Sequence, residues 1–417
     1  LGHYIKHVVV IIQENRSFEN FFAGWPGADA PTSGECHNKW TGKTTTIKLN
    51  AIDWSGTHTD LPHAYTSSWL DFDTQKGVLK MDGFCNPLIN PGQPAGLKPY
   101  TYVKHSLIAP YRAIAQQYVL ADHMFPSEAS GSFTGHLALV AGDTSLSKDT
   151  AVALVPTQAP WGCDAPAGTT VELLTSAHRF ITPGPFPCFT QIRSMADDLD
   201  AHNVSWKYYT PSIALPSGIW NPFDAIKTVR YSSDWQNNVV SPETTILTDA
   251  GSGNLPDVAW VVPSYTDSDH PPGSTFGPSW VASVINAIGE GPDWSSTAVV
   301  IVWDDWGGFY DNVPPPQLDY RGLGIRVPCL IVSPYARAGY VSHTQYEFGS
   351  ILKFIEQTFR LPPLGPTSQG YTDTRAASIV DSFDFTQKPR TFYPISAPVS
   401  ASYFFHLPPS DTPPDDE

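Results

Sequence analysis

The sequence predicts an α/β protein with a mostly parallel central sheet, and three observations support that class. Short apolar runs rich in β-branched residues recur along the chain, each bounded by polar residues, Gly or Pro. Segments with helical periodicity lie between these runs. The 417 residues are enough to bury a large core. Strands that alternate with helices favour a parallel sheet covered by helices.

Six runs are predicted strands and three segments are predicted helices. The strands are expected at residues 7–12, 118–121, 205–209, 258–262, 297–303 and 327–332. The helices are expected at residues 191–201, 280–288 and 346–359, and apolar residues share one face of the last. Each predicted strand is short and largely apolar, which is typical of strands buried on both faces of a sheet.

Two long stretches interrupt this alternation. Residues 24–104 and 144–189 are rich in Pro, Gly, Thr and Asn and have little periodicity. We expect them to be loop insertions that cap the crevice at the strand ends. Residues 1–405 are predicted to form a single domain with these insertions, and residues 406–417 an acidic, Pro-rich tail that is frayed.

The charge balance narrows the classes of partner. Asp and Glu number 40 against 24 Lys and Arg, a net charge of −16. This argues against nucleic acid or anionic membrane surfaces as partners of the whole molecule. No run of about 18 apolar residues exists, so no transmembrane segment is expected. The sequence begins at Leu1 without an initiator Met, which fits a processed protein that is secreted or periplasmic.

The five cysteines lack the spacing of a metal site. Cys36, Cys85, Cys163 and Cys188 lie in loop-like sequence and are expected to form two disulfides, with Cys163 and Cys188 the favoured pair. Cys329 lies within the predicted strand 327–332 and is expected to be a buried thiol.

Two pairs of residues, each with at least one carboxylate and called the acidic pairs, follow predicted strands at opposite ends of the chain. Glu14 and Asn15 come after residues 7–12, and Asp304 and Asp305 come after residues 297–303. In an open α/β sheet the carboxyl ends of the strands form one crevice where ligands bind. Carboxylate and amide oxygens suit one divalent cation such as Mg²⁺, Ca²⁺ or Mn²⁺, and Zn²⁺ is also compatible. The plainer interpretation is that each pair caps the segment that follows it.

A candidate nucleophile lies in the loop after the predicted strand 118–121. Ser132 follows Gly131 and precedes an apolar segment, and a hydroxyl at such a turn beside a metal loses its proton more easily. Ser132 would serve equally well as a helix N-cap. Ser127 and Ser130 in the same loop remain alternatives.

Four histidines are candidates for the remaining catalytic roles. They are His63, His136, His270 and His343. His270 and His343 follow predicted strands, as residues of the crevice should. An imidazole can orient the attacking oxygen, contact phosphate oxygens or protonate a leaving group. A single histidine in a loop is more often a structural residue.

Taken together, these motifs resemble a known family, the phosphoesterases that include non-specific phospholipases C and secreted acid phosphatases. The resemblance rests on residues 14–18, 264–272, 303–311 and 333–347, which occur in the expected order. It implies a three-layer α/β/α fold like that of alkaline phosphatase. It also implies one metal ion held by Glu14, Asn15, Asp304, Asp305 and the oxygen of the nucleophile, which aligns with Ser132. Phospholipases of the family commonly carry Asn-Arg shortly after the nucleophile, where this chain has Gly135 and His136.

The function expected from this resemblance is metal-dependent hydrolysis of phosphate monoesters, with Ser132 forming a phosphoserine that water then hydrolyses. The nucleophilic serine, and a chain that stops soon after the catalytic core, favour a secreted acid phosphatase, for which we expect an acidic pH optimum. One alternative is a phospholipase C that cleaves phosphatidylcholine, with Trp25, Trp40, Trp54, Trp69 and Trp161 caging the quaternary ammonium of the headgroup. The other is a non-catalytic secreted binding protein with a structural metal.

Overall fold

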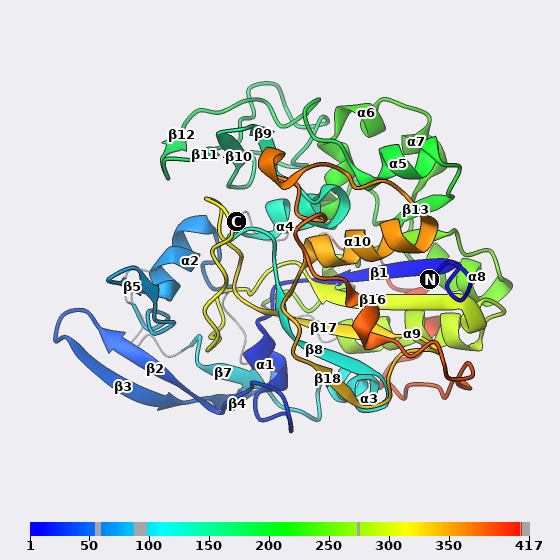
Figure 1. Cartoon of the computed structure of the whole chain (residues 1–417), viewed down its shortest axis with the longest axis horizontal. Helices are drawn as coiled ribbons and strands as arrows, with labels where there is room; N and C mark the ends of the chain where they lie inside the picture. Colours follow the sequence, from blue (N-terminus) through cyan, green and yellow to red (C-terminus); the bar gives the residue numbers. More distant parts are fainter. Residues whose placement is uncertain (55–59, 87–97, 273–275, 409, 411–417) are drawn as a thin grey trace.

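The centre of the protein is a nine-stranded sheet. The computed structural model describes residues 1–54, 60–86, 98–272, 276–408 and 410. The strands of this sheet are β1 (His7–Gln13), β8 (Val119–Phe125), β13 (Trp206–Tyr209), β14 (Val239–Val240), β15 (Val258–Val261), β16 (Thr297–Trp303), β17 (Val327–Val332), β18 (Tyr340–Ser342) and β19 (Tyr346–Glu347). Their order is β14-β13-β15-β1-β16-β17-β8-β18, and β19 also pairs with β8. Strands β1, β16, β17, β8 and β18 can be followed in this order in Figure 1.

All six predicted strands are confirmed, and so is the mostly parallel sheet. Every neighbouring pair in the order runs parallel except those made by β17, which is antiparallel to both β16 and β8. Because β17 is antiparallel to both of its neighbours, β8 and β16 run in the same direction. The carboxyl ends of β15, β1, β16 and β8 therefore lie at one edge of the sheet.

Helices cover both faces of the sheet. Trp260 on β15 pairs with Val10 and donates through Nε1 to the Leu139 carbonyl of α4 (Ser132–Ala141) at 3.1 Å. Trp303 on β16 pairs with Gln13, and its ring packs on Tyr111 of α3 (Ala109–Gln117) at 5.0 Å. Val10 and Gln13 are three residues apart on one strand and point to opposite faces. The α4 and α3 layers therefore lie on opposite sides, which confirms a three-layer α/β/α arrangement.

The other helices join one of these two layers. Helices α5 (Met195–Ala201) and α10 (Phe348–Phe359) contact α4, whereas α9 (Gly277–Glu290) contacts α3 and also α8 (Thr245–Ser252) and α11 (Ala401–Phe404). The three predicted helices are confirmed as α5, α9 and α10. Helix α5 starts later than predicted because Ser194 and Asp197 form a capping box. Helix α10 starts later because Tyr346 and Glu347 pair with β8 as β19.

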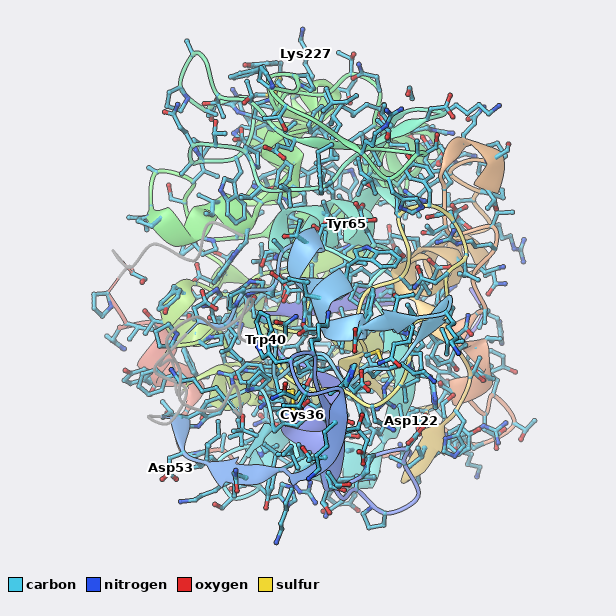
Figure 2. All side chains as sticks on the ribbon, turned by 90° about the vertical axis from the view of Figure 1, so that its left-hand side faces the viewer. Cys36, Trp40, Asp53, Tyr65, Asp122 and Lys227 are labelled. Carbon is cyan, nitrogen blue, oxygen red and sulfur yellow. A yellow bond between two sulfur atoms is a disulfide. The ribbon has the colours of Figure 1, made fainter. Side chains whose placement is uncertain are left out.

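The two insertions consist of short hairpins and one short helix. The first contains β2 (Ser33–Asn38), β3 (Lys43–Lys48), β4 (Asn50–Ile52), α2 (Tyr65–Phe72), β5 (Thr74–Gln75), β6 (Val78–Leu79) and β7 (Thr101–Val103). The second contains a four-stranded sheet of β9 (Ser145–Ser147), β10 (Thr150–Val152), β11 (Leu173–Thr175) and β12 (Phe180–Ile181). Most of these strands have two or three residues, too few for a visible alternation, and the longer strands β2 and β3 are mostly polar. Hairpins β2–β3 and β5–β6 and strand β12 lie on the left of Figure 1, and Figure 2 views that side.

Both predicted disulfides are present. Cys36 on β2 bonds to Cys85, and Cys163 bonds to Cys188, as expected for the favoured pair. Each disulfide lies within one insertion, so the two cross-links hold the hairpins that lack a large core of their own. Cys329 on β17 is a buried free thiol, as predicted.

Among the described residues, no helix is both long enough and apolar enough to cross a membrane. Most of the predicted tail at 406–417 lies outside the described residues.

Candidate active site

The two acidic pairs meet at the carboxyl edge of the sheet. Strands β1 and β16 are parallel and pair up to Gln13 and Trp303, so the residues that follow them leave the sheet side by side. The backbone N–H of Asn15 donates to Asp304 Oδ1 at 3.0 Å, and that of Arg16 donates to the Asp305 carbonyl at 3.0 Å. Glu14, Asn15, Asp304 and Asp305 are all fully buried. The meeting expected across the sheet is therefore observed.

Two unusual backbone conformations hold these pairs together. Asn15 has φ +55° and Gly307 has φ +60°, both in the left-handed region. A Cβ on Gly307 would lie 2.2 Å from the Asn15 carbonyl oxygen, so only glycine fits there. The Gly307 N–H donates to Asp305 Oδ1 at 2.7 Å. The glycine after the acidic pair thus fixes the carboxylate of Asp305 and lets the first pair approach.

Ser132 is the serine of the 127–132 loop that contacts the acidic pairs. Its Oγ lies 3.1 Å from Asp305 Oδ2 and 3.5 Å from Asn15 Oδ1. Ser130 instead donates to the Ala153 carbonyl, and Ser127 Oγ has no hydrogen-bond partner in the described part of the chain. Ser132 is the first residue of α4 and Gly131 is the N-cap, so the N-cap interpretation of Ser132 was wrong by one residue.

His63 comes from the first insertion and reaches the same cluster. Its Nε2 lies 2.8 Å from Asn15 Nδ2 and 4.0 Å from Asp305 Oδ2. Its Nδ1 lies 2.6 Å from the Leu61 carbonyl, which can only accept a hydrogen bond. The proton therefore sits on Nδ1, and Nε2 accepts from the Asn15 amide. The first insertion thus contributes a side chain to the site.

His136 lies between two of the predicted metal ligands. It is four residues after Ser132 on α4, so both side chains share one face of the helix. Its Nε2 lies 2.9 Å from Glu14 Oε1 and 3.7 Å from Asp304 Oδ2. Burial lowers the pKa of this imidazole to about 4, against the opposing effect of Asp304. A neutral imidazole in contact with two carboxylates can serve as a metal ligand as well as a catalytic group.

The donor set fits a divalent cation. One atom each of Glu14, His136 and Asp304 lie within 4.8 Å of one another, next to the contacts among Asn15, Ser132 and Asp305. Three carboxylates buried this close together repel unless a positive charge compensates them. Asp304 Oδ2 is buried and makes no hydrogen bond within the described residues. Oxygen donors with one imidazole suit a divalent ion, so the chemistry of these residues agrees with the predicted metal site.

His270 lies behind an aromatic ring that the sequence interpretation missed. Trp220, in the 3₁₀ turn η2 (Pro216–Trp220), stacks on His136 with ring centroids 6.5 Å apart and on His270 with centroids 5.7 Å apart. His270 Nδ1 bonds to the Pro271 carbonyl. Trp220 lies in an irregular Pro-rich stretch without periodicity, so the only signal was a large aromatic residue in an unassigned loop.

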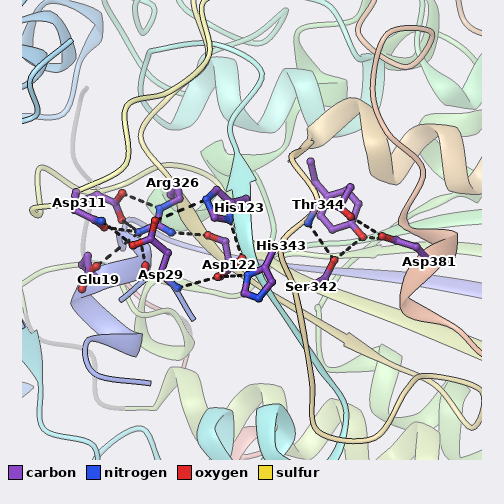
Figure 3. A network of polar contacts seen from close by, with 12 residues as sticks. Glu19, Asp29, Asp122, His123, Asp311, Arg326, Ser342, His343, Thr344 and Asp381 are labelled. Carbon is purple, nitrogen blue, oxygen red and sulfur yellow. Dashed lines mark hydrogen bonds and ion pairs between the residues drawn. The ribbon is translucent and has the colours of Figure 1, made fainter. Parts of the chain in front are cut away.

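The structure does not bring His343 to this cluster. His343 Nδ1 lies 2.9 Å from Asp122 Oδ2, and its side chain is 60% exposed. His123 Nδ1 binds the other oxygen of the same carboxylate at 2.8 Å (Figure 3). Strand β18 pairs Ser342 with Ala121, so His343 lies opposite the middle of β8 and not at its carboxyl end. The sequence interpretation placed His343 in the crevice because it follows the predicted strand 327–332, and it did not predict β18.

The predicted tryptophan cage is also absent. Trp54 packs beneath the Arg16 guanidinium at 5.4 Å, Trp25 beneath that of Arg112 at 4.6 Å, and Trp161 against Phe133 at 6.0 Å. Trp69 packs on Phe72 of its own helix, and Trp40 is 77% exposed. These five rings therefore belong to different parts of the insertions and do not surround one position.

A buried carboxyl group anchors the base of the site. Asp269 accepts from Tyr111 Oη at 2.7 Å and from Trp303 Nε1 at 3.1 Å, and burial raises its pKa to about 7. Its carbonyl accepts from Arg16 Nε at 2.8 Å. The segment around residue 269 is thereby fixed to the ends of β1 and β16.

Comparison with known proteins places this site in a family. The sequence profile of the Phosphoesterase family matches residues 5–362. Phospholipase C B of Mycobacterium tuberculosis is 27% identical over 48% of this chain and 45% of its own length. Phospholipase C A of the same organism is 24% identical over 94% of this chain and 80% of its own length. The chain thus spans about half the length of the first of these relatives.

A solved structure of an alkaline phosphatase superfamily protein from Vibrio parahaemolyticus is 11% identical, with a TM-score of 0.40, covering 91% of this chain and 72% of that one. The family profile covers most of the chain, including both acidic pairs, Ser132 and all four candidate histidines. The chain belongs to the Phosphoesterase family.

Proposed function

We propose that the protein hydrolyses phosphoric esters with Ser132 as the nucleophile. The observation that carries this proposal is the contact of Ser132 Oγ with Asp305 Oδ2 and Asn15 Oδ1 at the start of α4. The N-terminus of a ten-residue helix favours negative charge, both on an ionised serine and on the phosphate that it attacks. The family membership supports the same chemistry.

The residues for binding a cation are Glu14, Asn15, Ser132, Asp304 and Asp305, with His136 against two of them. A divalent ion held there would lower the pKa of the serine hydroxyl and neutralise charge on the phosphoryl oxygens. Ser132 Oγ forms a bond to phosphorus as the bond from phosphorus to the leaving oxygen breaks, and the leaving oxygen takes up a proton. Water then cleaves the phosphoserine and releases phosphate or a phosphomonoester.

The remaining residues hold these groups in position. His63 keeps its Nε2 directed at Asn15 through the bond of Nδ1 to Leu61. Gly307 and Gly135 let the backbone at Asn15 and Asp304 pack closely, because a Cβ at either glycine would lie within 2.6 Å of a carbonyl oxygen. Such preorganisation is the main contribution of a protein to phosphoryl transfer.

We infer that the substrate is a phospholipid diester. The relatives with the printed function of phospholipase C support this choice, one of them over 94% of this chain. In the sequence analysis the nucleophilic serine favoured monoesters, whereas the departure of Gly135 and His136 from the phospholipase pattern concerned the position of the nucleophile. His136 contacts Glu14 and Asp304, so that departure concerns the metal ligands and does not argue for a monoester.

The test is a comparison of two chromogenic substrates. Metal-stripped protein is assayed with p-nitrophenyl phosphate and p-nitrophenyl phosphorylcholine while single divalent ions are added back. We expect activity on the phosphorylcholine diester to exceed that on the monoester. A preference for the monoester, with an acidic optimum, would support the acid phosphatase expected from the sequence. Hydrolysis of neither would contradict the proposed function.

We further infer that the protein acts in a secreted or periplasmic location. Its two disulfides are typical of proteins from oxidising compartments.

A further inference from the structure

The two insertions meet at an apolar pocket on the surface. The pocket has a volume of about 570 Å³ and is lined by Tyr65, Thr66, Trp69, Leu70, His178 and Phe180. The Tyr65 ring meets that of Phe180 edge-on at 5.8 Å, and the Trp69 ring meets that of His178 at 6.1 Å. Helix α2 of the first insertion and the β11–β12 hairpin of the second therefore form one surface, in which aromatic rings predominate.

Helix α2 connects this pocket to the candidate active site. On its inner side, Asp71 Oδ2 accepts from Trp306 Nε1 at 3.2 Å, and Ser68 Oγ donates to the Ala129 carbonyl at 2.9 Å. Trp306 follows Asp305, and Ala129 lies three residues before Ser132. Tyr65, Trp69 and Leu70 line the pocket on the other side of the same helix. The pocket and these chain neighbours of Asp305 and Ser132 thus lie on opposite sides of one helix.

The hairpins on this side of the molecule expose large apolar side chains, of which Phe180 also lines the pocket. Trp40 between β2 and β3 is 77% exposed, Val78 on β6 is 54% exposed, and Phe180 and Ile181 on β12 are 38% and 40% exposed. Figure 2 labels Trp40 and Tyr65 in its view onto this side of the molecule. His37 Nδ1 on β2 lies 2.7 Å from Asp73 Oδ2 just after α2, so the first hairpin is fixed to the helix that lines the pocket.

The tip of each of these hairpins carries basic residues, of which Lys39 forms an ion pair with Asp73 at 3.3 Å. Trp40 is flanked by Lys39 and Lys43, Val78 by Lys76 and Lys80, and Phe180 by Arg179. This arrangement stands out in a chain with a net charge of −16. Aromatic rings with neighbouring lysines suit the boundary between lipid headgroups and acyl chains, where the rings partition and the ammonium groups meet lipid phosphates.

We propose that these tips, together with the pocket, dock the protein onto a zwitterionic phospholipid surface and that the pocket takes an acyl chain. The net negative charge opposes an anionic surface, whereas the basic tips match the exposed phosphates of phosphatidylcholine. Projecting tips insert into a fluid surface more readily than they pack on the surface of a folded protein. The proposal deepens the proposed function, because a phospholipid substrate is met at such a surface.

The experiment measures binding separately from turnover. Phosphatidylcholine vesicles are sedimented with the Ser132→Ala protein, with and without Trp40→Ala or Phe180→Ala. Loss of one interfacial aromatic side chain should weaken partitioning into the vesicles about tenfold, because less apolar surface is then buried in the lipid. Tyr393→Ala is the matched control, because Tyr393 is 69% exposed and lies outside both insertions, and it should not change partitioning.

The outcomes separate the two proposals. Trp40→Ala should leave hydrolysis of soluble p-nitrophenyl phosphorylcholine unchanged, since Trp40 does not contact the catalytic cluster. Absence of vesicle binding by the parent protein, or equal binding by Trp40→Ala and Tyr393→Ala, would overturn the docking proposal. Concentration-dependent self-association that Trp40→Ala abolishes would assign the surface to a second copy instead. Vesicle binding without hydrolysis of any ester would retain the docking surface and contradict only the proposed function.

Discussion

Ser132 Oγ lies 3.1 Å from Asp305 Oδ2, although the two residues are 173 positions apart. The contact joins the first turn of α4, which follows β8, to the end of β16. Strands β8 and β16 are the two neighbours of β17 in the sheet. This contact distinguishes Ser132 from Ser127 and Ser130 as the proposed nucleophile.

Replacement of this serine by alanine should abolish catalysis. We expect Ser132→Ala to lower kcat on p-nitrophenyl phosphorylcholine by about a thousandfold or more, because the covalent intermediate cannot form. Ser130→Ala should cost stability and retain most activity, since Ser130 bonds to the Ala153 carbonyl. Steady-state kinetics with a circular dichroism check of folding would test both. Full activity in Ser132→Ala would assign the nucleophile elsewhere.

Removal of one predicted metal ligand should reduce metal content and activity together. Asp304→Asn keeps the size of the side chain and a possible acceptor for the Asn15 N–H but removes the charge. We expect loss of bound metal after dialysis and a fall in kcat of about a thousandfold at low metal concentration. Elemental analysis and kinetics measure these effects. Asp53→Asn, which removes a surface pair with Lys104, should change neither quantity.

Substitution of His63 should lower kcat much more than substitution of His343. His63 contacts Asn15 within the cluster, whereas His343 is bound to Asp122 on the middle of β8. His63→Ala should lower kcat by about a hundredfold, the usual range for a group that assists proton transfer or positions such a group. His343→Ala should leave kcat within about twofold of the parent value. The same assay measures both, and a large loss of kcat in His343→Ala would mean that the Asp122 cluster takes part in the reaction.

Glu128 should make the protein less stable as the pH rises. It is 3% exposed, and burial raises the pKa of its carboxyl group to about 8, although Arg321 opposes the shift. The folded state therefore holds a proton that the unfolded state loses above about pH 4.5. The contribution of Glu128 to the free energy of unfolding is therefore fully present below that pH and is lost as the pH rises towards 8.

We expect Glu128→Gln to remove this dependence. Between pH 5 and 8 the parent should lose on the order of a few kcal/mol of unfolding free energy relative to Glu128→Gln. Urea denaturation at the two pH values measures the difference. Parallel pH profiles for both proteins would show that Glu128 is ionised in the folded state.

Regular features of the fold could be predicted because buried parallel strands have a clear signature. The six strands of four or more residues in the central sheet were found, and residues after β1 and β16 could be paired because their carboxyl ends must share an edge. Strand β18 has three residues and lies at the sheet edge, so its register against β8 could not be predicted. His343 was misplaced because it was assigned to the crevice from the predicted strand 327–332, whereas it follows β18. Trp220 and the hairpins of the insertions were missed because their positions depend on tertiary contacts and not on periodicity.

The position of β1 has a consequence for biosynthesis. β1 lies between β15 and β16, which end at residues 261 and 303. A ribosome adds about 5–20 residues each second, so the first strand made waits on the order of tens of seconds for either neighbour. During that time its apolar residues need protection from aggregation. A nascent chain released before β15 would leave β1 with no partner in the sheet, so premature termination should yield insoluble fragments and not smaller active enzymes.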